Sequence, residues 1–285
     1  MLRIPLPPHL VAQARAYADG SLTPAEPRDA ATVVLVRAGS SEGPEVYLLH
    51  RQASMAFAAG MFVFPGGGVD PRDFDHTLGW AGPSAEEWAE RLGTDAPMAR
   101  ALVCAAVRET FEESGVLLAG ASVDEVVADT TSQDWEADRV ALEARDLSLT
   151  AFLERRGLVL RSDLLGAWAG WLTPAFEPRR YRTWFFVAVL PEGQRTRDVS
   201  SESASVTWMS ALQAVASVEA GELMMMPPTY LTCLEVGQYG SPREVLDAAR
   251  GRTVEMFTPE VEGEGSAAAL SVPERLRALI ESRTS

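Results

Sequence analysis

A long helical segment, from about Pro97 to Ser114, gives the strongest indication of how this chain folds. Its proline near the first position favours helix initiation, and Gly115 suits a left-handed residue at the helix end. One side of the segment is apolar and forms the natural core face, with Val103, Cys104, Val107 and Phe111. We therefore expect Cys104 to be a small packed hydrophobe rather than a nucleophile.

Short segments on both sides of this helix have the composition of β-strands. Ala31–Arg37, Glu45–Arg51 and Met61–Phe64 precede it, and the third is stopped by a proline and the glycines 66–68. Tyr181–Leu190 follows the helix and is the most convincing strand in the sequence. Because strands precede, interleave with and follow helices, the class is α/β or α+β rather than a helical bundle.

Composition excludes several classes of function. The 285 residues carry 25 basic against 40 acidic side chains, and the net charge of −15 argues against a broad DNA- or RNA-binding surface. A small anionic substrate stays compatible, because it needs only a local basic cluster or a bound cation. The 2 cysteines and 3 histidines have no zinc-type spacing and argue against a Ser-His-Asp triad.

Targeting signals are also lacking in the sequence. No apolar run approaches the roughly 20 residues of a membrane span, and the first ten residues lack the apolar core of a signal peptide. We expect a cytoplasmic protein with neither membrane nor nucleic-acid partners. The lack of Lys and Asn indicates a GC-rich genome and a bacterial source.

Three glutamates lie on the side of the long helix opposite its apolar face. Glu109, Glu112 and Glu113 fall within about 100° of arc. Like-charged helical neighbours repel by only about 0.2–0.5 kcal/mol per pair, so helix spacing alone favours an ordinary solvated acidic face. The spacing does not decide between such a face and a functional site.

The residues around these glutamates resemble the signature of the Nudix hydrolases, GX₅EX₇REUXEEXGU, in which U is aliphatic. Phe62–Asp70 places a strand and a tight glycine turn ahead of the helix, and Arg108–Val116 (RETFEESGV) follows the second half of the pattern. Gly67 takes the first glycine, and Asp73 stands where the isolated glutamate belongs.

Three departures from the pattern stand out. Asp73 replaces glutamate, Thr110 replaces the aliphatic residue, and residues 74–107 number 34 where the pattern has 7, so that 34 − 7 = 27 are extra. A looped-out insertion accounts for the long spacer. Interrupted boxes of this kind exist in Nudix relatives that include a peroxisomal coenzyme A diphosphatase branch, which this chain resembles.

The resemblance implies an α/β/α sandwich with a mixed central sheet, helical insertions and extra C-terminal helices. The expected organisation is an N-terminal arm at 1–28, a Nudix domain at 29–258 with insertions at about 74–96 and 120–168 and C-terminal helices from about 210, and a flexible linker with a short helix at 259–285. The pairs Ser84–Glu87, Ser210–Gln213 and Ser241–Glu244 predict three helix starts. Leu276, Leu279 and Ile280 form one stripe, which packs on the chain's own core or on a partner subunit, so a homodimer is an open possibility.

The resemblance also implies a metal-dependent site. Nudix enzymes use Mg²⁺ or Mn²⁺, which suits an acidic helix face without His or Cys. Glu112 and Glu113 would be the main metal ligands, Glu109 a further ligand or the group that takes the proton of the attacking water, and Arg108 the residue that holds the carboxylates in place.

Outside the signature, the candidates are fewer. Glu202 is a candidate ligand or general base, against an ordinary surface glutamate. Arg51 would reach a substrate phosphate, against a structural pair with a nearby acid. The remaining candidates for substrate binding are Gly67, Gly68, Arg180 and Arg182.

The substrate implied by the resemblance is a nucleoside diphosphate linked to another group. Leu48–Ser54 and Gly60–Gly67 partly match a motif found upstream of the box in coenzyme A enzymes. This match favours coenzyme A or acyl-coenzyme A, cleaved to 3′,5′-ADP and (acyl-)phosphopantetheine. ADP-ribose, NADH or a nucleotide sugar is the alternative, and a non-catalytic nucleotide-sensing Nudix module is the second alternative.

Overall fold

The structure of the chain is a computed structural model, and it describes residues 8–39, 43–55, 58–263 and 268–283. A mixed sheet lies at its centre, in the order β10-β2-β1-β9-β8-β11, with β3 paired to β2 and β4 paired to β1. The β1–β9 and β8–β11 pairs are parallel, and the other pairs are antiparallel. The strands are β1 (Arg28–Ala38), β2 (Pro44–Arg51), β3 (Phe62–Val63), β4 (Gly66–Gly68), β8 (Leu165–Leu172), β9 (Tyr181–Val189), β10 (Ser203–Ser210) and β11 (Met256–Phe257).

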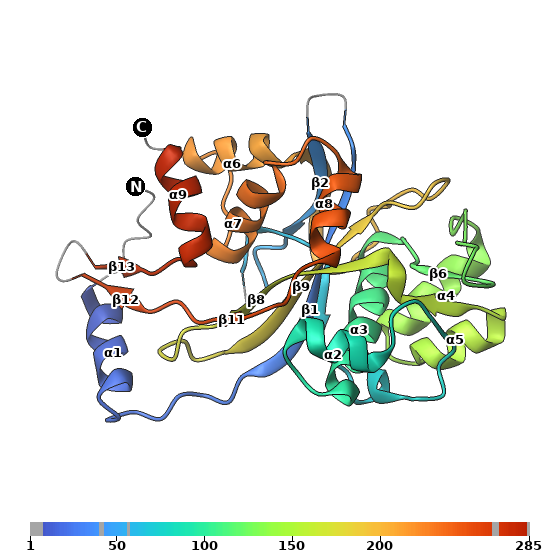
Figure 1. Ribbon diagram of the computed structural model, residues 1–285, viewed down its shortest axis with the longest axis horizontal. Coiled ribbons are helices and arrows are strands. Elements are labelled where there is room, and N and C mark those ends of the chain that lie inside the picture. Colours follow the sequence, from blue (N-terminus) through green and yellow to red (C-terminus); the bar gives the residue numbers. More distant parts are fainter. Residues whose placement is uncertain (1–7, 40–42, 56–57, 264–267, 284–285) are drawn as a thin grey trace.

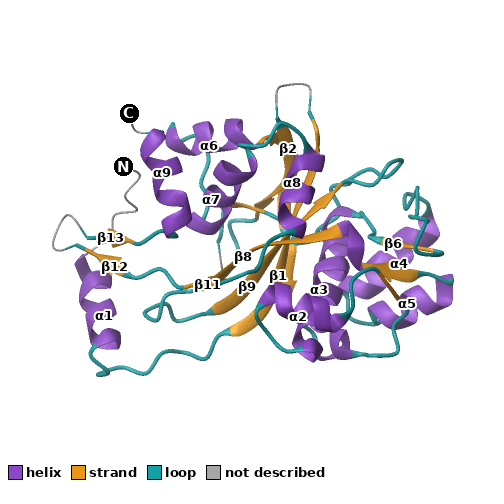
Figure 2. Cartoon of the chain, in the orientation of Figure 1, coloured by secondary structure: helices purple, strands orange, loops and turns teal. Residues whose placement is uncertain are grey.

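Both faces of this sheet are covered by helices, as Figures 1 and 2 show. Along β1, Val33 and Leu35 pack into one hydrophobic core and Val34 and Val36 into another, because successive side chains point to opposite faces. The first core is covered by α2 (Ala85–Leu92) and α3 (Ala96–Ser114), and the second by α6 (Ala211–Glu219), α7 (Pro227–Val236), α8 (Pro242–Arg250) and α9 (Glu274–Ser282). The expected α/β/α sandwich with a mixed sheet is therefore confirmed.

The long helix predicted from the sequence is α3. Asp95 caps its first turn by accepting a hydrogen bond from Met98 N, and Gly115 ends it with a φ of 74°. Cys104 is buried, as expected, and burial raises the pKa of its thiol to about 12. Among the expected caps, Ser84 and Ser241 each accept a hydrogen bond from the predicted partner residue. Ser210 is the N-cap residue of α6, so this helix start is confirmed, but its side chain forms no capping hydrogen bond and the expected pairing with Gln213 was wrong.

The second expected insertion, 120–168, is only partly helical. It contains α4 (Gln133–Glu143) and α5 (Leu149–Arg156), but also β7 (Val159–Arg161), which joins β5 (Trp80–Ala81) and β6 (Ala119–Gly120) in a small sheet. The prediction that this insertion is helical up to about residue 168 is wrong at its end, where the chain forms β8. This strand is buried on both faces and shows no polar alternation. A Cβ at Gly166 would lie 2.4 Å from the Ala249 Cβ, so the glycine allows α8 to pack closely on the sheet.

The two ends of the chain add small elements around the sandwich. The expected N-terminal arm contains α1 (Pro8–Ala18), in which Gln13 donates a hydrogen bond to Phe176 O. The expected linker falls partly on residues 264–267, which lie outside the described residues, and it is flanked by β12 (Val261–Glu262) paired with β13 (Ala269–Leu270). In α9, Leu276 and Ile280 pack into the same core as α7, so the predicted apolar stripe covers the chain's own core.

A short 3₁₀ turn, η1 (Pro71–Phe74), connects β4 to the first insertion, and a second, η2 (Ser162–Leu164), precedes β8. None of the helices in the described part of the chain combines the length and the apolar composition that a membrane span requires.

Candidate active site

The acidic end of α3 packs against the glycine strand β4. Gly66 N donates a hydrogen bond to Glu113 Oε2 at 2.8 Å, and Gly68 O accepts one from Arg108 Nη2 at 3.0 Å. A Cβ at Gly67 would lie 2.5 Å from the carboxyl carbon of Glu109, so the Glu109 carboxylate would have to move. Gly67 therefore lets Glu109 lie against the backbone of β4 in its present position.

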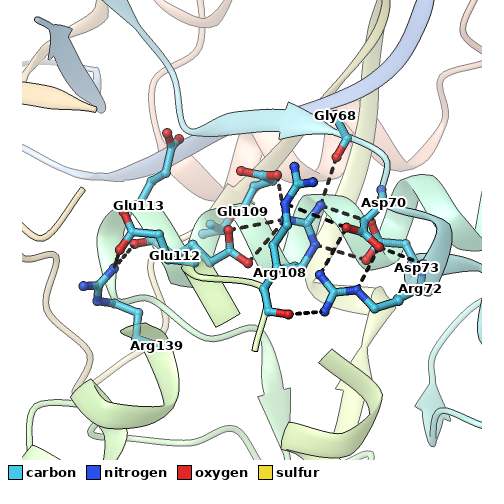
Figure 3. Close-up of polar contacts among 12 residues, drawn as sticks. Gly68, Asp70, Arg72, Asp73, Arg108, Glu109, Glu112, Glu113 and Arg139 are labelled. Carbon is cyan, nitrogen blue, oxygen red and sulfur yellow. Dashed lines mark hydrogen bonds and ion pairs between the residues drawn. The ribbon is translucent and has the colours of Figure 1, made fainter. Parts of the chain in front are cut away.

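Arg108 lies at the centre of the site (Figure 3). Its guanidinium donates to Glu109 Oε1 at 2.6 Å and to both oxygens of Glu112 at 3.3 Å. On its other side, Nε and Nη2 donate to the two oxygens of Asp73 at 3.1 and 3.0 Å. Asp73, at the position of the signature's isolated glutamate, thus holds Arg108 and also caps η1 by accepting from Asp70 N.

Four carboxylates form what we call the acidic cluster: Asp73, Glu109 and Glu112, which contact Arg108, and Glu113, which accepts from Gly66 N. Glu112 is 7% exposed and Glu113 is 8% exposed, and the Glu109 side chain is nearly as well covered. The interpretation of α3 as carrying an ordinary solvated acidic face is therefore wrong. Charges are expensive to bury without a partner, and Arg108 supplies only one positive charge.

The pKa values of the cluster reflect this excess of negative charge. Burial, together with repulsion from Glu109, raises the pKa of Glu112 to about 7. Burial and the Glu109 charge raise the pKa of Glu113 well above its ordinary value. Burial alone would lower the pKa of Arg108, but the surrounding carboxylates raise it. The cluster can be fully ionised only at a cost that additional positive charge would relieve.

The donors of the acidic cluster fit a hard divalent cation such as Mg²⁺ or Mn²⁺, which prefers oxygen ligands. Within the described ranges, no three His, Cys, Asp or Glu side chains are already arranged so that together they could hold a metal ion. Mg²⁺ does not need such an arrangement, because it is usually bound by one or two carboxylates and completes its coordination with water and substrate phosphates.

Two candidates from outside the signature meet beside this cluster. Arg51 ends β2, and its Nη2 donates to Glu202 Oε2 at 2.7 Å, in the turn that leads into β10. Burial is the main reason why the pKa values of Glu109 and Glu113 are raised, and the negative charge of Glu202 raises both by a smaller amount. Glu202 therefore lies near both glutamates. The buried Nε of Arg51 has no hydrogen-bond partner among the described residues. Arg51 thus forms the pair with a nearby acid that was expected as the alternative to phosphate binding, and that acid is Glu202, itself a candidate site residue.

The remaining arginine candidates have their contacts elsewhere. Arg180 donates to Thr173 O and to Ala25 O, both at 3.0 Å. Arg182 pairs with Asp29 at 3.2 Å. These contacts join the start of β9 to the end of β8 and to the chain around the start of β1, and neither arginine contacts the acidic cluster in the described structure. Their role in substrate binding stays a prediction.

One arginine at the site was missed from the sequence. Arg139 on α4 is 3% exposed, and its Nη1 donates to the backbone carbonyl of Glu112 at 2.7 Å (Figure 3). In the sequence it has glutamates three residues before and four residues after, which is the ordinary pattern of a surface helix. No local signal could have linked it to α3, because the contact depends on how the insertion packs.

Comparisons with known proteins agree with this geometry. The family model described as the NUDT19 Nudix domain matches residues 81–235. The "Acyl-coenzyme A diphosphatase NUDT19" of Xenopus laevis is 25% identical over 219 residues, 65% of this chain and 58% of the frog protein. The protein of the same name in Gallus gallus is 25% identical over 279 residues, 80% of this chain and 72% of the chicken protein.

The chain spans less than two thirds of the length of the frog relative, and 57% of that of a Caenorhabditis elegans relative. Among solved structures, a crystal structure of a Nudix hydrolase from Alicyclobacillus acidocaldarius has a TM-score of 0.65 and 25% identity. That match covers 78% of this chain and 96% of the other. The family match, the sandwich fold and the signature residues around Arg108 lead to one conclusion: the chain belongs to the Nudix hydrolase family.

Proposed function

We propose that this chain hydrolyses the diphosphate bond of coenzyme A or an acyl-coenzyme A, giving 3′,5′-ADP and (acyl-)phosphopantetheine. The observation that carries the proposal is the buried acidic cluster, which Glu113 and Arg108 hold against the glycine strand. The coenzyme A class is supported by the names of the frog and chicken relatives, and by the partial motif at Leu48–Ser54 and Gly60–Gly67.

Nudix hydrolases generally depend on a divalent metal ion. In this chain Glu112 and Glu113 would hold Mg²⁺ or Mn²⁺, with Glu109 as a further ligand. When bound, the ion would neutralise charge on the diphosphate and activate the attacking water. A bound cation also explains how a chain with a net charge of −15 accepts an anionic substrate.

The chain's own residues have separate roles in this reaction. Water attacks one phosphorus, the bridging P–O bond breaks, and the leaving phosphate keeps the electron pair of that bond. Glu202 would take the proton of the attacking water, and the 50% exposure of its side chain beside the cluster supports this role. Arg51, with its Nε free of other partners among the described residues, would donate to a substrate phosphate. Arg108 keeps Glu109 and Glu112 in place.

The test is turnover of a substrate panel with Mg²⁺ or Mn²⁺, with products separated by chromatography. The panel contains coenzyme A, acetyl-coenzyme A, dephospho-coenzyme A, ADP-ribose, NADH and a nucleotide sugar. We expect chelator-sensitive release of 3′,5′-ADP from coenzyme A. Equal turnover of dephospho-coenzyme A would argue against a site that recognises the 3′-phosphate, and preference for ADP-ribose, NADH or the sugar would overturn the coenzyme A assignment. No cleavage of any compound would overturn the enzymatic proposal and favour a nucleotide sensor.

A further inference from the structure

The C-terminal turn of α3 is held by one arginine side chain and one backbone N–H from other parts of the chain. The last carbonyls of a helix lack intrahelical partners, and they form its negative end. This turn carries Glu112 and Glu113 but no basic residue of its own. Arg139 Nη1 donates to Glu112 O at 2.7 Å, and Arg197 N donates to Ser114 O at 2.9 Å. The backbone beside the metal-binding glutamates is therefore fixed from α4 and from the segment between β9 and β10.

The same arginine connects this turn to Glu143 on α4. Arg139 Nη1 donates to Glu143 Oε2 at 2.9 Å, while its Nε and Nη2 are used by Glu136. The other oxygen of Glu143 accepts from Ser201 N at 3.1 Å and from Ser201 Oγ at 2.6 Å. Ser201 directly precedes Glu202. An unbroken series of hydrogen bonds thus runs from the backbone of Glu112 to the residue before Glu202.

The Ser201–Glu202 segment is also held from the sheet. The side chain of Gln52 donates to Ser201 O at 2.9 Å, and Gln52 N donates to Glu202 O at 3.1 Å. The Glu202 carboxylate itself is held by Arg51. Glu143 therefore supplies the contacts from the α3 side of the site, and β2 supplies those from the other side.

We propose that Arg139 and Glu143 are positioning residues, which fix Glu202 relative to the glutamates of α3. The proposal rests on the proposed function, in which Glu202 takes the proton of the attacking water. It gives the insertion that carries α4 a role in the reaction, although the insertion contributes no residue to the acidic cluster.

The geometry favours positioning over simple stabilisation. Arg139 uses the planar fork of its guanidinium to bind three acceptors at once, an arrangement that lysine cannot reproduce. Glu143 uses one oxygen for Arg139 and the other for Ser201, which a glutamine amide cannot do because its nitrogen only donates. Small errors in the placement of a proton acceptor reduce turnover far more than they reduce stability.

The experiment is a double-mutant cycle on the full chain with Glu143→Gln and Glu202→Gln, assayed with coenzyme A and Mg²⁺ and, in parallel, with ADP-ribose. Asp138→Asn is the matched control, because Asp138 is a buried carboxylate on the same helix that pairs with Arg155 and Arg156, outside this series of contacts. Assays are run well below the melting temperature of every variant.

We expect Glu202→Gln to lower kcat by about 100-fold or more, as loss of a general base does. Glu143→Gln should lower kcat on the order of 10-fold with KM changed by less than about 2-fold. It should cause no further loss in the Glu202→Gln background. Arg139→Lys should reproduce the Glu143→Gln effect, and Asp138→Asn should retain its kcat.

Equal losses from Glu143→Gln in both backgrounds, or the same loss from Asp138→Asn, would show a merely structural role and overturn the proposal. Full kcat in Glu202→Gln would overturn it as well, because no proton acceptor would be there to position. In that case chelator-sensitive turnover that is lost in Glu112→Gln would show that the proposed function still holds.

Discussion

Two buried arginines hold the C-terminal half of α3, and their surroundings differ. The partners of Arg108 are the carboxylates of Asp73, Glu109 and Glu112, all of them poorly exposed, and they outnumber it. Arg139 pairs with two glutamates of its own helix, Glu136 and Glu143, whose side chains are 35% and 27% exposed. Arg197 adds a second positive charge to the Arg139 group through Glu136.

The pKa values show the consequence of this difference. Around Arg108, burial and mutual repulsion raise the pKa of Glu112 to about 7. Around Arg139, partial burial acts to raise the pKa of Glu136, but the hydrogen bonds from Arg139 and Arg197 outweigh it and lower that pKa. Glutamates at helix spacing thus form a group with excess negative charge around Arg108 and a balanced ionic network around Arg139. Only the first has a chemical reason to bind a cation.

The largest expected difference between the two arginines is in stability. Arg108→Met removes the guanidinium that pairs with Asp73, Glu109 and Glu112, and we expect the free energy of unfolding to fall by about 3–5 kcal/mol in a chelating buffer. Arg139→Met should cost less, about 1–3 kcal/mol, because its partners can be solvated and Glu136 keeps Arg197. Urea unfolding at fixed pH measures both. Equal losses of unfolding free energy in the two variants would contradict the difference between the surroundings of Arg108 and Arg139.

A smaller effect is expected at the glycine strand, where two adjacent residues provide a matched pair. A Cβ at Gly67 would displace the Glu109 carboxylate, whereas a Cβ at Gly68 would meet only Asp29 O, at 3.9 Å. We expect Gly67→Ala to lower kcat/KM by about 10- to 100-fold and Gly68→Ala to have little effect. Steady-state kinetics with the best panel substrate would show this. Similar losses in both variants would indicate that the strand, rather than the position of Glu109, is being disturbed.

The smallest effect is expected at the end of the Arg139 network. Ser201→Ala removes the hydroxyl that donates to Glu143 and leaves the backbone N–H in place. Loss of one exposed hydrogen bond should lower kcat by about 2- to 3-fold, with no change in melting temperature. Kinetics and calorimetry on the same preparation provide the check. A loss as large as that of Glu143→Gln would mean that the hydroxyl, not the backbone contact, holds the turn.

The sequence was informative where the determinants are local. The α3 helix follows from its apolar face, its proline and Gly115, and the signature places Arg108 and its glutamates. The strand β8 was missed because burial on both faces removes the alternation by which strands are recognised. The burial of the glutamates could not be predicted from spacing, since it depends on β4 and η1 packing over α3.

Contacts between distant segments also escaped prediction. Arg51 and Glu202 were each proposed separately, but their pairing requires the β2–β10 register, in which Ser203 lies opposite Arg51. Arg139 has no signature at all, because its role comes from its contact with the carbonyl of Glu112, 27 positions earlier in the chain (139 − 112 = 27), and from the contact of its partner Glu143 with Ser201.

The most direct test of the central claim is anomalous scattering from crystals soaked in Mn²⁺, with Glu112→Gln crystals as the control. The account predicts a Mn²⁺ ion bound by carboxylate oxygens of Glu112 and Glu113 in the wild type, and loss or strong weakening of that peak in the variant. A Mn²⁺ ion that binds only elsewhere, or soaked wild-type crystals without a peak beside either glutamate, would contradict it.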